Sequence, residues 1–159
     1  MSDSKLKITL PIICILWICL IFSMSSDANS YYKTLSFSQE ISSQIHGDTA
    51  EAVIEANKDS NIEVDIINLG IRKSCHFLEF LVLSVLLLKT SEVYGMKSKK
   101  TIFYILIFCL LIAGFDEFYQ GFIPGRNPAV IDSLVDFGGA FTGMVSYLGI
   151  GRLIGRARS

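Results

Sequence analysis

Ionisable side chains occur at the ends of several apolar stretches, where a hydrophobic environment makes them costly unless they have a function. His76 lies three residues before Glu79, and Asp132 lies four residues before Asp136, so each pair shares one helix face. An imidazole beside a carboxylate can exchange protons, and clustered carboxylates can bind a ligand that donates hydrogen bonds. The candidate ligand-binding residues are Arg72, Lys73, His76, Glu79, Asp116, Glu117, Gln120, Arg126, Asp132 and Asp136.

Two interpretations of this set remain open. The side chains could pair between helices and hold them in register, each bond contributing about 0.6–2 kcal/mol. They could instead line a pocket that binds a polar headgroup or an external ligand. Pairing between helices would work equally well at either end of a bundle, whereas a pocket explains why the set gathers at one end. The sequence therefore favours the pocket.

Catalysis and metal binding are weaker alternatives. If the protein is an enzyme, His76, Glu79 and Asp136 are the residues suited to acid–base roles. No nucleophile elbow or phosphate-binding loop surrounds Ser74 or Ser133, so the sequence does not argue for an enzyme. The chain has two histidines, which is few for a metal site, and we expect neither a metal nor a cofactor.

Four apolar stretches must position these residues. They predict transmembrane helices at 8–24, 72–94, 101–120 and 129–150, each close to the roughly 20 residues that cross a bilayer. Hydrophobic residues make up 51% of the 159-residue chain, which excludes an ordinary soluble domain or a disordered chain. We therefore expect a single all-α, polytopic membrane domain over 1–159, with a polar site at its outer face.

The basic residues predict the orientation of the helices. Nine of the 14 lysines and arginines precede the first stretch, separate the second from the third, or follow the fourth: Lys5, Lys7, Lys89, Lys97, Lys99, Lys100, Arg152, Arg156 and Arg158. Such residues favour the cytoplasmic side, so both termini are expected there in the plasma membrane. They form no basic stripe with interleaved aromatics, so nucleic-acid binding is not expected.

The acidic segment 27–69 is expected outside the cytoplasm and to be partly helical, with a helix-compatible run at Thr49–Asn57. An alternative for residues 1–28 is a cleaved signal peptide, because a basic start and an apolar run precede small residues. In the fourth stretch, Gly139 and Gly143 share the stripe of Asp132 and Asp136. This spacing predicts close helix packing, with both carboxylates pointing into the bundle. The oligomeric state does not follow from the sequence.

Three segments resemble the VanZ-like family of small membrane proteins. Residues 72–80, 116–126 and 132–139 are similar to that family's RK-x-x-HF-x-E-[YF], DE-x-x-Q-x-x-x-PGR and D-x-x-x-[DN]-x-x-G patterns, in the same order. All ten candidate residues occupy positions in these patterns. The resemblance implies a polytopic helical membrane protein linked to low-level resistance to teicoplanin, a lipidated glycopeptide that attacks cell-wall precursors.

These observations together predict an envelope protein. We expect an outward pocket that binds an envelope component or a lipoglycopeptide and thereby contributes to teicoplanin resistance. The partners would be membrane lipids and a lipid-linked cell-wall precursor or lipoglycopeptide. A membrane enzyme that modifies a lipid-linked or phosphate-bearing headgroup is the alternative.

Overall fold

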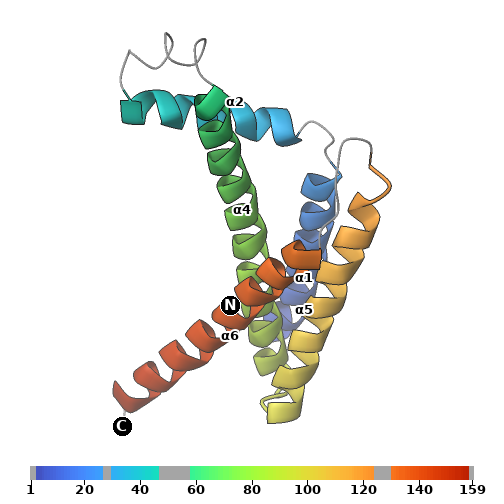
Figure 1. The fold of residues 1–159 in the computed structure, drawn as a ribbon. Coiled ribbons are helices and arrows are strands. Elements are labelled where there is room, and N and C mark those ends of the chain that lie inside the picture. The colour runs from blue at the N-terminus through green and yellow to red at the C-terminus, as the bar shows by residue number, and fades with distance from the viewer. Residues whose placement is uncertain (1–2, 27–29, 47–57, 124–129, 158–159) are drawn as a thin grey trace. The chain divides into compact units, whose positions relative to one another are not determined.

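The fold is helical throughout the part of the chain that the structure describes. The computed structural model describes residues 3–26, 30–46, 58–123 and 130–157, and these contain no strand. The helices are α1 (Asp3–Ser25), α2 (Ser30–His46), α4 (Lys58–Val93), α5 (Lys99–Gln120) and α6 (Val130–Ala157) (Figure 1). The predicted all-α class is therefore confirmed. Helix α4 begins well before the predicted start at residue 72, and α6 continues beyond the predicted end at 150.

Two helices are long and apolar enough to cross a membrane. They are the segments Ser4–Ser25 in α1 and Lys99–Gln120 in α5. The expectation of four membrane-spanning helices remains a prediction.

The chain divides into two compact units, one formed by Met1–Ser26 with His76–Ser159 and the other by Asp27–Cys75. In the second unit, the buried side chains include Ser38 and Ser42 of α2, and Val64 and Asn68 of α4. The predicted helical run at Thr49–Asn57 lies outside the described residues. Helix α2 occupies an earlier stretch, and among its described side chains those that are buried are Ser38 and Ser42.

Hydrogen bonds establish how α1 runs beside α4 in the first unit. The Tyr94 hydroxyl donates to the carbonyl of Lys7 at 2.7 Å. Farther along, the Trp17 indole donates to the carbonyl of Glu79 at 2.9 Å. Since the start of α1 meets the end of α4, the two helices run antiparallel.

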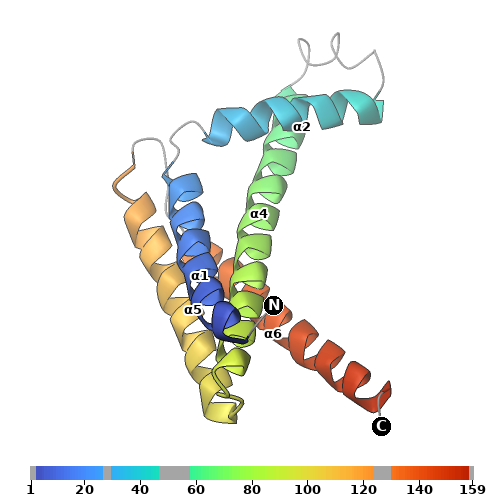
Figure 2. The same ribbon diagram turned by 180° about the vertical axis from the view of Figure 1, so that it is seen from behind.

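Helices α5 and α6 continue the up-and-down arrangement that α1 and α4 begin. Ser25, at the end of α1, contacts Asp116 near the end of α5, so these helices run in the same direction and lie side by side in both views (Figures 1 and 2). The Ser133 hydroxyl lies 3.5 Å from the Ala113 carbonyl. The Tyr147 hydroxyl donates to Glu92. Helix α6 therefore runs back toward the end of α4, crossing the other helices obliquely.

The turn between α4 and α5 is defined by its capping residues. Gly95 adopts φ 76°, and the backbone N–H groups of Gly95 and Met96 donate to the carbonyls of Glu92 and Ser91. This is the Schellman arrangement, in which glycine tolerates the left-handed conformation that ends a helix. Ser98 then caps α5 by accepting a hydrogen bond from the backbone of Thr101 at 3.1 Å. A short, rigid turn thus holds the two helices as neighbours.

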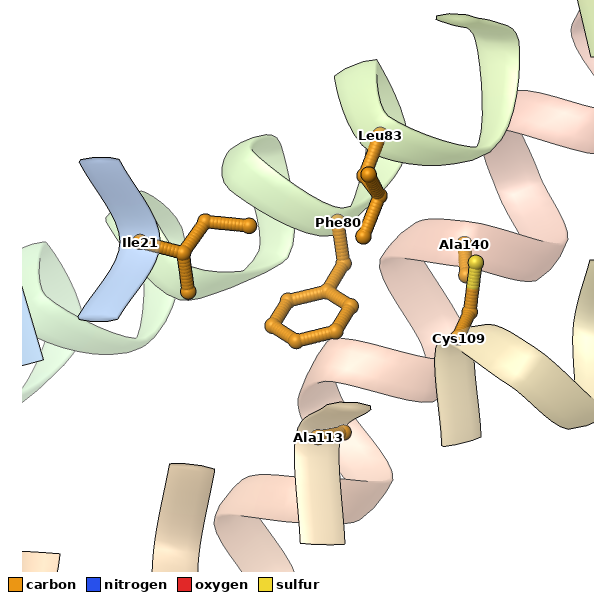
Figure 3. Close-up of a cluster of buried hydrophobic side chains, with 6 residues drawn as sticks. All are labelled: Ile21, Phe80, Leu83, Cys109, Ala113 and Ala140. Atoms are coloured by element: carbon orange, nitrogen blue, oxygen red, sulfur yellow. The ribbon is translucent and has the colours of Figure 1, made fainter. Parts of the chain in front are cut away.

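A small apolar core joins all four helices of the first unit. The cluster contains Ile21 of α1, Phe80 and Leu83 of α4, Cys109 and Ala113 of α5, and Ala140 of α6 (Figure 3). Cys109 is fully buried and packs as a small hydrophobic side chain, and all four cysteines are free. The core lies directly beside the turns that carry the polar residues, so it determines where those residues meet.

Two glycines allow α6 to approach α4 closely. A Cβ atom at Gly139 would overlap the carbonyl oxygen of Phe77. A Cβ atom at Gly143 would overlap the Ser84 hydroxyl and the Leu81 carbonyl. The face of α6 that carries Gly139 and Gly143 is therefore covered by α4 of the same chain. The same contact brings the helical turn before Gly139 close to the part of α4 around His76.

Candidate functional site

Three ionisable side chains from three helices meet at one end of the first unit. One ligand atom from each of His76 (α4), Asp116 (α5) and Asp136 (α6) lies within 4.8 Å of the other two. Asp136 stands one helical turn before Gly139, so the close packing of that glycine brings the carboxylate to α4. The cluster thus follows from the helix packing described above.

Asp136 is the most deeply buried member of the cluster. Its exposed fraction is 0%, and its Oδ1 atom lies 3.5 Å from Nδ1 of His76. Neither carboxylate oxygen accepts a hydrogen bond in the part of the chain that the structure describes. Buried carboxylates are ordinarily paired or hydrogen-bonded, because desolvation of a charge is costly. Asp136 therefore has His76 as an ion-pair partner but no hydrogen bond among the described residues, which is unusual for so deeply buried a carboxylate.

Asp116 is held in place by neighbouring hydrogen bonds. Its Oδ2 atom accepts one from the Ser25 hydroxyl at 2.7 Å and another from the Gln120 amide at 2.8 Å. Its Oδ1 atom accepts none in the described structure. The two hydrogen bonds to Oδ2 fix the orientation of the carboxylate and leave Oδ1 able to contact a ligand.

Three further carboxylates lie around this centre. Glu79 is buried, and its Oε2 atom lies 4.0 Å from Nδ1 of His76. Glu117 is buried, whereas Asp132 in the first turn of α6 is half-buried. The carboxylates of Asp116, Glu117, Glu79 and Asp132 all interact electrostatically with Asp136. The site is strongly acidic, which favours a cation or a hydrogen-bond donor as its ligand.

An apolar groove of about 590 Å³ lies between α5 and α6, and it includes Glu117, which follows Asp116 in the sequence. Glu117 and Ser133 contribute its polar groups. Exposed aromatic side chains, Phe118 and Phe122, line it together with Val130. The combination of an apolar groove and adjacent carboxylates is suited to an amphiphile, with its hydrocarbon in the groove and its polar group toward the acids.

The predicted ligand-binding residues are distributed over both units of the chain. Of the ten, His76, Glu79, Asp116, Glu117, Gln120, Asp132 and Asp136 belong to the first unit. Arg72 and Lys73 are half-buried residues of the second unit, and Arg126 lies outside the described residues. The members of the set that the first unit contains are the five carboxylates, His76 and Gln120.

Ser25 is a site residue that the sequence did not single out. Its hydroxyl contacts Asp116 and also lies 3.4 Å from the Gln120 amide, so it links α1 to the cluster. A serine at the end of an apolar helix is common, and only its tertiary neighbours reveal this role. The polar residues at the end of α1 could nevertheless have suggested the contact, because the acidic residues of α5 also lie near the end of their helix.

A second polar cluster occupies the opposite end of the first unit. Glu92 forms ion pairs with Lys89 and Lys97, both at 3.2 Å, and accepts a hydrogen bond from Tyr147. These residues line a cavity of about 640 Å³ that also includes Arg152. The bond between Tyr147 and Glu92 fastens α6 to α4, and the two lysines offset the charge of Glu92, in contrast to the acidic centre.

Comparison with known proteins agrees with the motif pattern. A family model described as VanZ/LLP1 matches residues 10–153, a range that includes all ten candidate residues and Ser25. The resemblance to the VanZ-like family is thereby confirmed. No curated protein and no solved structure matches the chain.

Proposed function

Because the chain belongs to the VanZ/LLP1 family, we propose that it is an envelope protein that binds an amphiphilic ligand at the cluster of His76, Asp116 and Asp136. The ligand is a lipid-linked envelope component or a lipoglycopeptide, and its capture lowers the access of teicoplanin to cell-wall precursors. The observation that carries the proposal is the convergence of a histidine and two buried aspartates from three helices, with an apolar groove at the neighbouring Glu117. Such a site matches a molecule with both hydrocarbon and hydrogen-bond donors.

The proposed topology has four membrane-spanning helices with both termini in the cytoplasm. The alternating directions of α1, α4, α5 and α6 support this arrangement, because each successive helix returns toward the previous end. Lys7, Lys89, Lys97 and Lys99 gather at the end of the unit opposite the acidic cluster. Basic residues favour the cytoplasmic side, so the acidic cluster would face outward.

Substitution of the cluster should abolish protection. In cells that express the protein, His76→Gln and Asp136→Asn are expected to reduce the teicoplanin concentration tolerated to that of cells without the protein. The reason is that each change removes one of the groups that would contact the ligand while nearly preserving side-chain volume. The measurement is the minimal inhibitory concentration, with immunoblotting of the membrane fraction to establish equal expression.

Glu92→Gln is the matched control, because it also neutralises one carboxylate of the same unit but at the opposite end. It should retain full protection. Wild-type protection by His76→Gln and Asp136→Asn at equal expression would disprove a ligand site at the cluster.

A membrane enzyme that modifies a lipid-linked headgroup is the second candidate. The observation in its favour is the imidazole of His76 between two carboxylates, 3.5 Å from Asp136 and 4.0 Å from Glu79. This geometry suits a general base that removes a proton from water or from a substrate hydroxyl. Lipid and precursor profiles of cells with and without the protein distinguish the two, since only an enzyme creates or removes a species.

A further inference from the structure

We propose that His76, Asp116 and Asp136 bind one divalent transition-metal cation. Their three ligand atoms already lie within 4.8 Å of one another, although they come from three different helices. Nδ1 of His76 and Oδ1 of Asp136 are 3.5 Å apart. Two ligands around a tetrahedral ion with bonds of about 2.1 Å are separated by about 3.4 Å. Small side-chain rotations would therefore complete the coordination.

The surroundings of Asp136 independently favour a cation at this position. This side chain is 0% exposed, and both of its oxygens lack a hydrogen bond in the described residues. His76 is its sole ion-pair partner in the described part of the chain, and other carboxylates surround it. A bound divalent ion would satisfy both oxygens and offset the repulsion among the acids.

The surroundings of Asp116 resemble the outer shell of a metal centre. Ser25 and Gln120 donate hydrogen bonds to Oδ2, which orients the carboxylate and leaves Oδ1 for a ligand bond. Carboxylates that bind metals are commonly fixed in this way by hydrogen-bonding neighbours. Ser25 and Gln120 would therefore act as positioning residues.

The mixture of ligands determines the class of ion. One imidazole with two carboxylates suits zinc, manganese or ferrous iron better than calcium, which takes six to eight oxygens. Glu79, 4.0 Å from His76, is placed to serve as a fourth ligand. The small number of histidines in the sequence argued against a metal site, but carboxylates supply most of the ligands in this one. With His76, Asp116 and Asp136 as ligands, the fourth position of a tetrahedral ion would be taken by Glu79, by water or by a ligand oxygen.

Cobalt(II) is the probe for this site, because its visible absorption reports both binding and coordination geometry. The full chain would be purified in detergent, treated with a chelator, exchanged into buffer and titrated with Co²⁺. Wild type should bind one Co²⁺ per chain with visible bands that Zn²⁺ displaces. His76→Gln and Asp136→Asn should show no bands over the same range. Ser25→Ala should weaken binding by roughly 10-fold to 100-fold, the usual cost of losing an outer-shell partner.

Glu92→Gln is again the matched control and should bind Co²⁺ as wild type does. The wild-type titration tests the metal site even if a variant fails to fold. Absence of saturable Co²⁺ binding by folded wild-type protein would overturn the metal site. Equal binding by wild type and Asp136→Asn would also overturn it.

The metal site concerns the same cluster as the proposed function, but it does not depend on the identity of the envelope ligand. Loss of teicoplanin protection in Asp136→Asn, together with no metal binding by wild type, would refute the metal and leave the proposed function standing. Metal binding by wild type, together with unchanged teicoplanin protection in Asp136→Asn, would refute the proposed function and leave the metal site standing.

Discussion

Asp136→Asn is expected to increase the free energy of unfolding of the metal-free protein, even though it removes the function. A buried carboxylate without hydrogen bonds costs stability, and neighbouring acids repel its charge. Neutralisation should therefore stabilise the first unit by on the order of 1 kcal/mol. The measurement is thermal unfolding of chelator-treated protein in detergent, followed by circular dichroism or by size-exclusion chromatography after heating.

The sign of this change separates a ligand site from simple pairing between helices. If Asp136 only held α6 to α4 through His76, then Asp136→Asn would lower stability, by about 0.6–2 kcal/mol for an interhelical hydrogen bond. The same substitution at Glu92 should lower stability, because that carboxylate has partners in Lys89, Lys97 and Tyr147. Added Co²⁺ should stabilise wild type by about 2.7 kcal/mol at 100 times its dissociation constant and should not stabilise Asp136→Asn.

Gly139→Leu should cause the largest loss of stability. Even the first carbon of the new side chain overlaps the Phe77 carbonyl, so α6 must move away from α4 or the unit must unfold. Overpacking of a close contact costs about 1–3 kcal/mol, and a clash with backbone lies at the upper end of that range. The expected result is a reduced yield of folded, monodisperse protein and a lower melting temperature.

Gly149→Leu provides the matched control on the same helix. A Cβ atom at Gly149 has no neighbouring atom within 4 Å, and leucine favours helix over glycine by up to about 1 kcal/mol. This variant should be as stable as wild type or more stable. If Gly139→Leu were equally stable, the close approach of α6 to α4 would be incorrect, and the position of Asp136 with it.

Part of the geometry of the candidate site could be predicted from the sequence, because His76, Asp116 and Asp136 do lie close together. His76, Asp116 and Asp136 could be identified because ionisable residues at the ends of apolar stretches are unusual in helices that pack in hydrocarbon. The close-packing face of α6 followed from the spacing of Gly139 and Gly143. Both inferences use local helical periodicity, which depends only on the order of residues.

Features that depend on tertiary contacts or on polar helices were missed. Helix α2 was not predicted at Ser30–His46 because the side chains that it buries include Ser38 and Ser42. The early start of α4 was missed because its first turns are polar, although they remain helical. The bond between Ser25 and Asp116 joins residues 91 positions apart, so no local pattern could reveal it.

In the proposed topology, the acidic cluster faces outward, at the end of the unit opposite the lysines. The direct test is labelling of single cysteines by a membrane-impermeant maleimide in intact cells, in a background where Cys14, Cys19, Cys75 and Cys109 are replaced. Phe122, 70% exposed, adjoins the cluster, whereas Lys97 pairs with Glu92 at the opposite end. Each signal is normalised to labelling of the solubilised protein. We predict that Phe122→Cys reacts in intact cells and that Lys97→Cys reacts only after permeabilisation; reaction of Lys97→Cys from outside, with Phe122→Cys protected, would contradict the account.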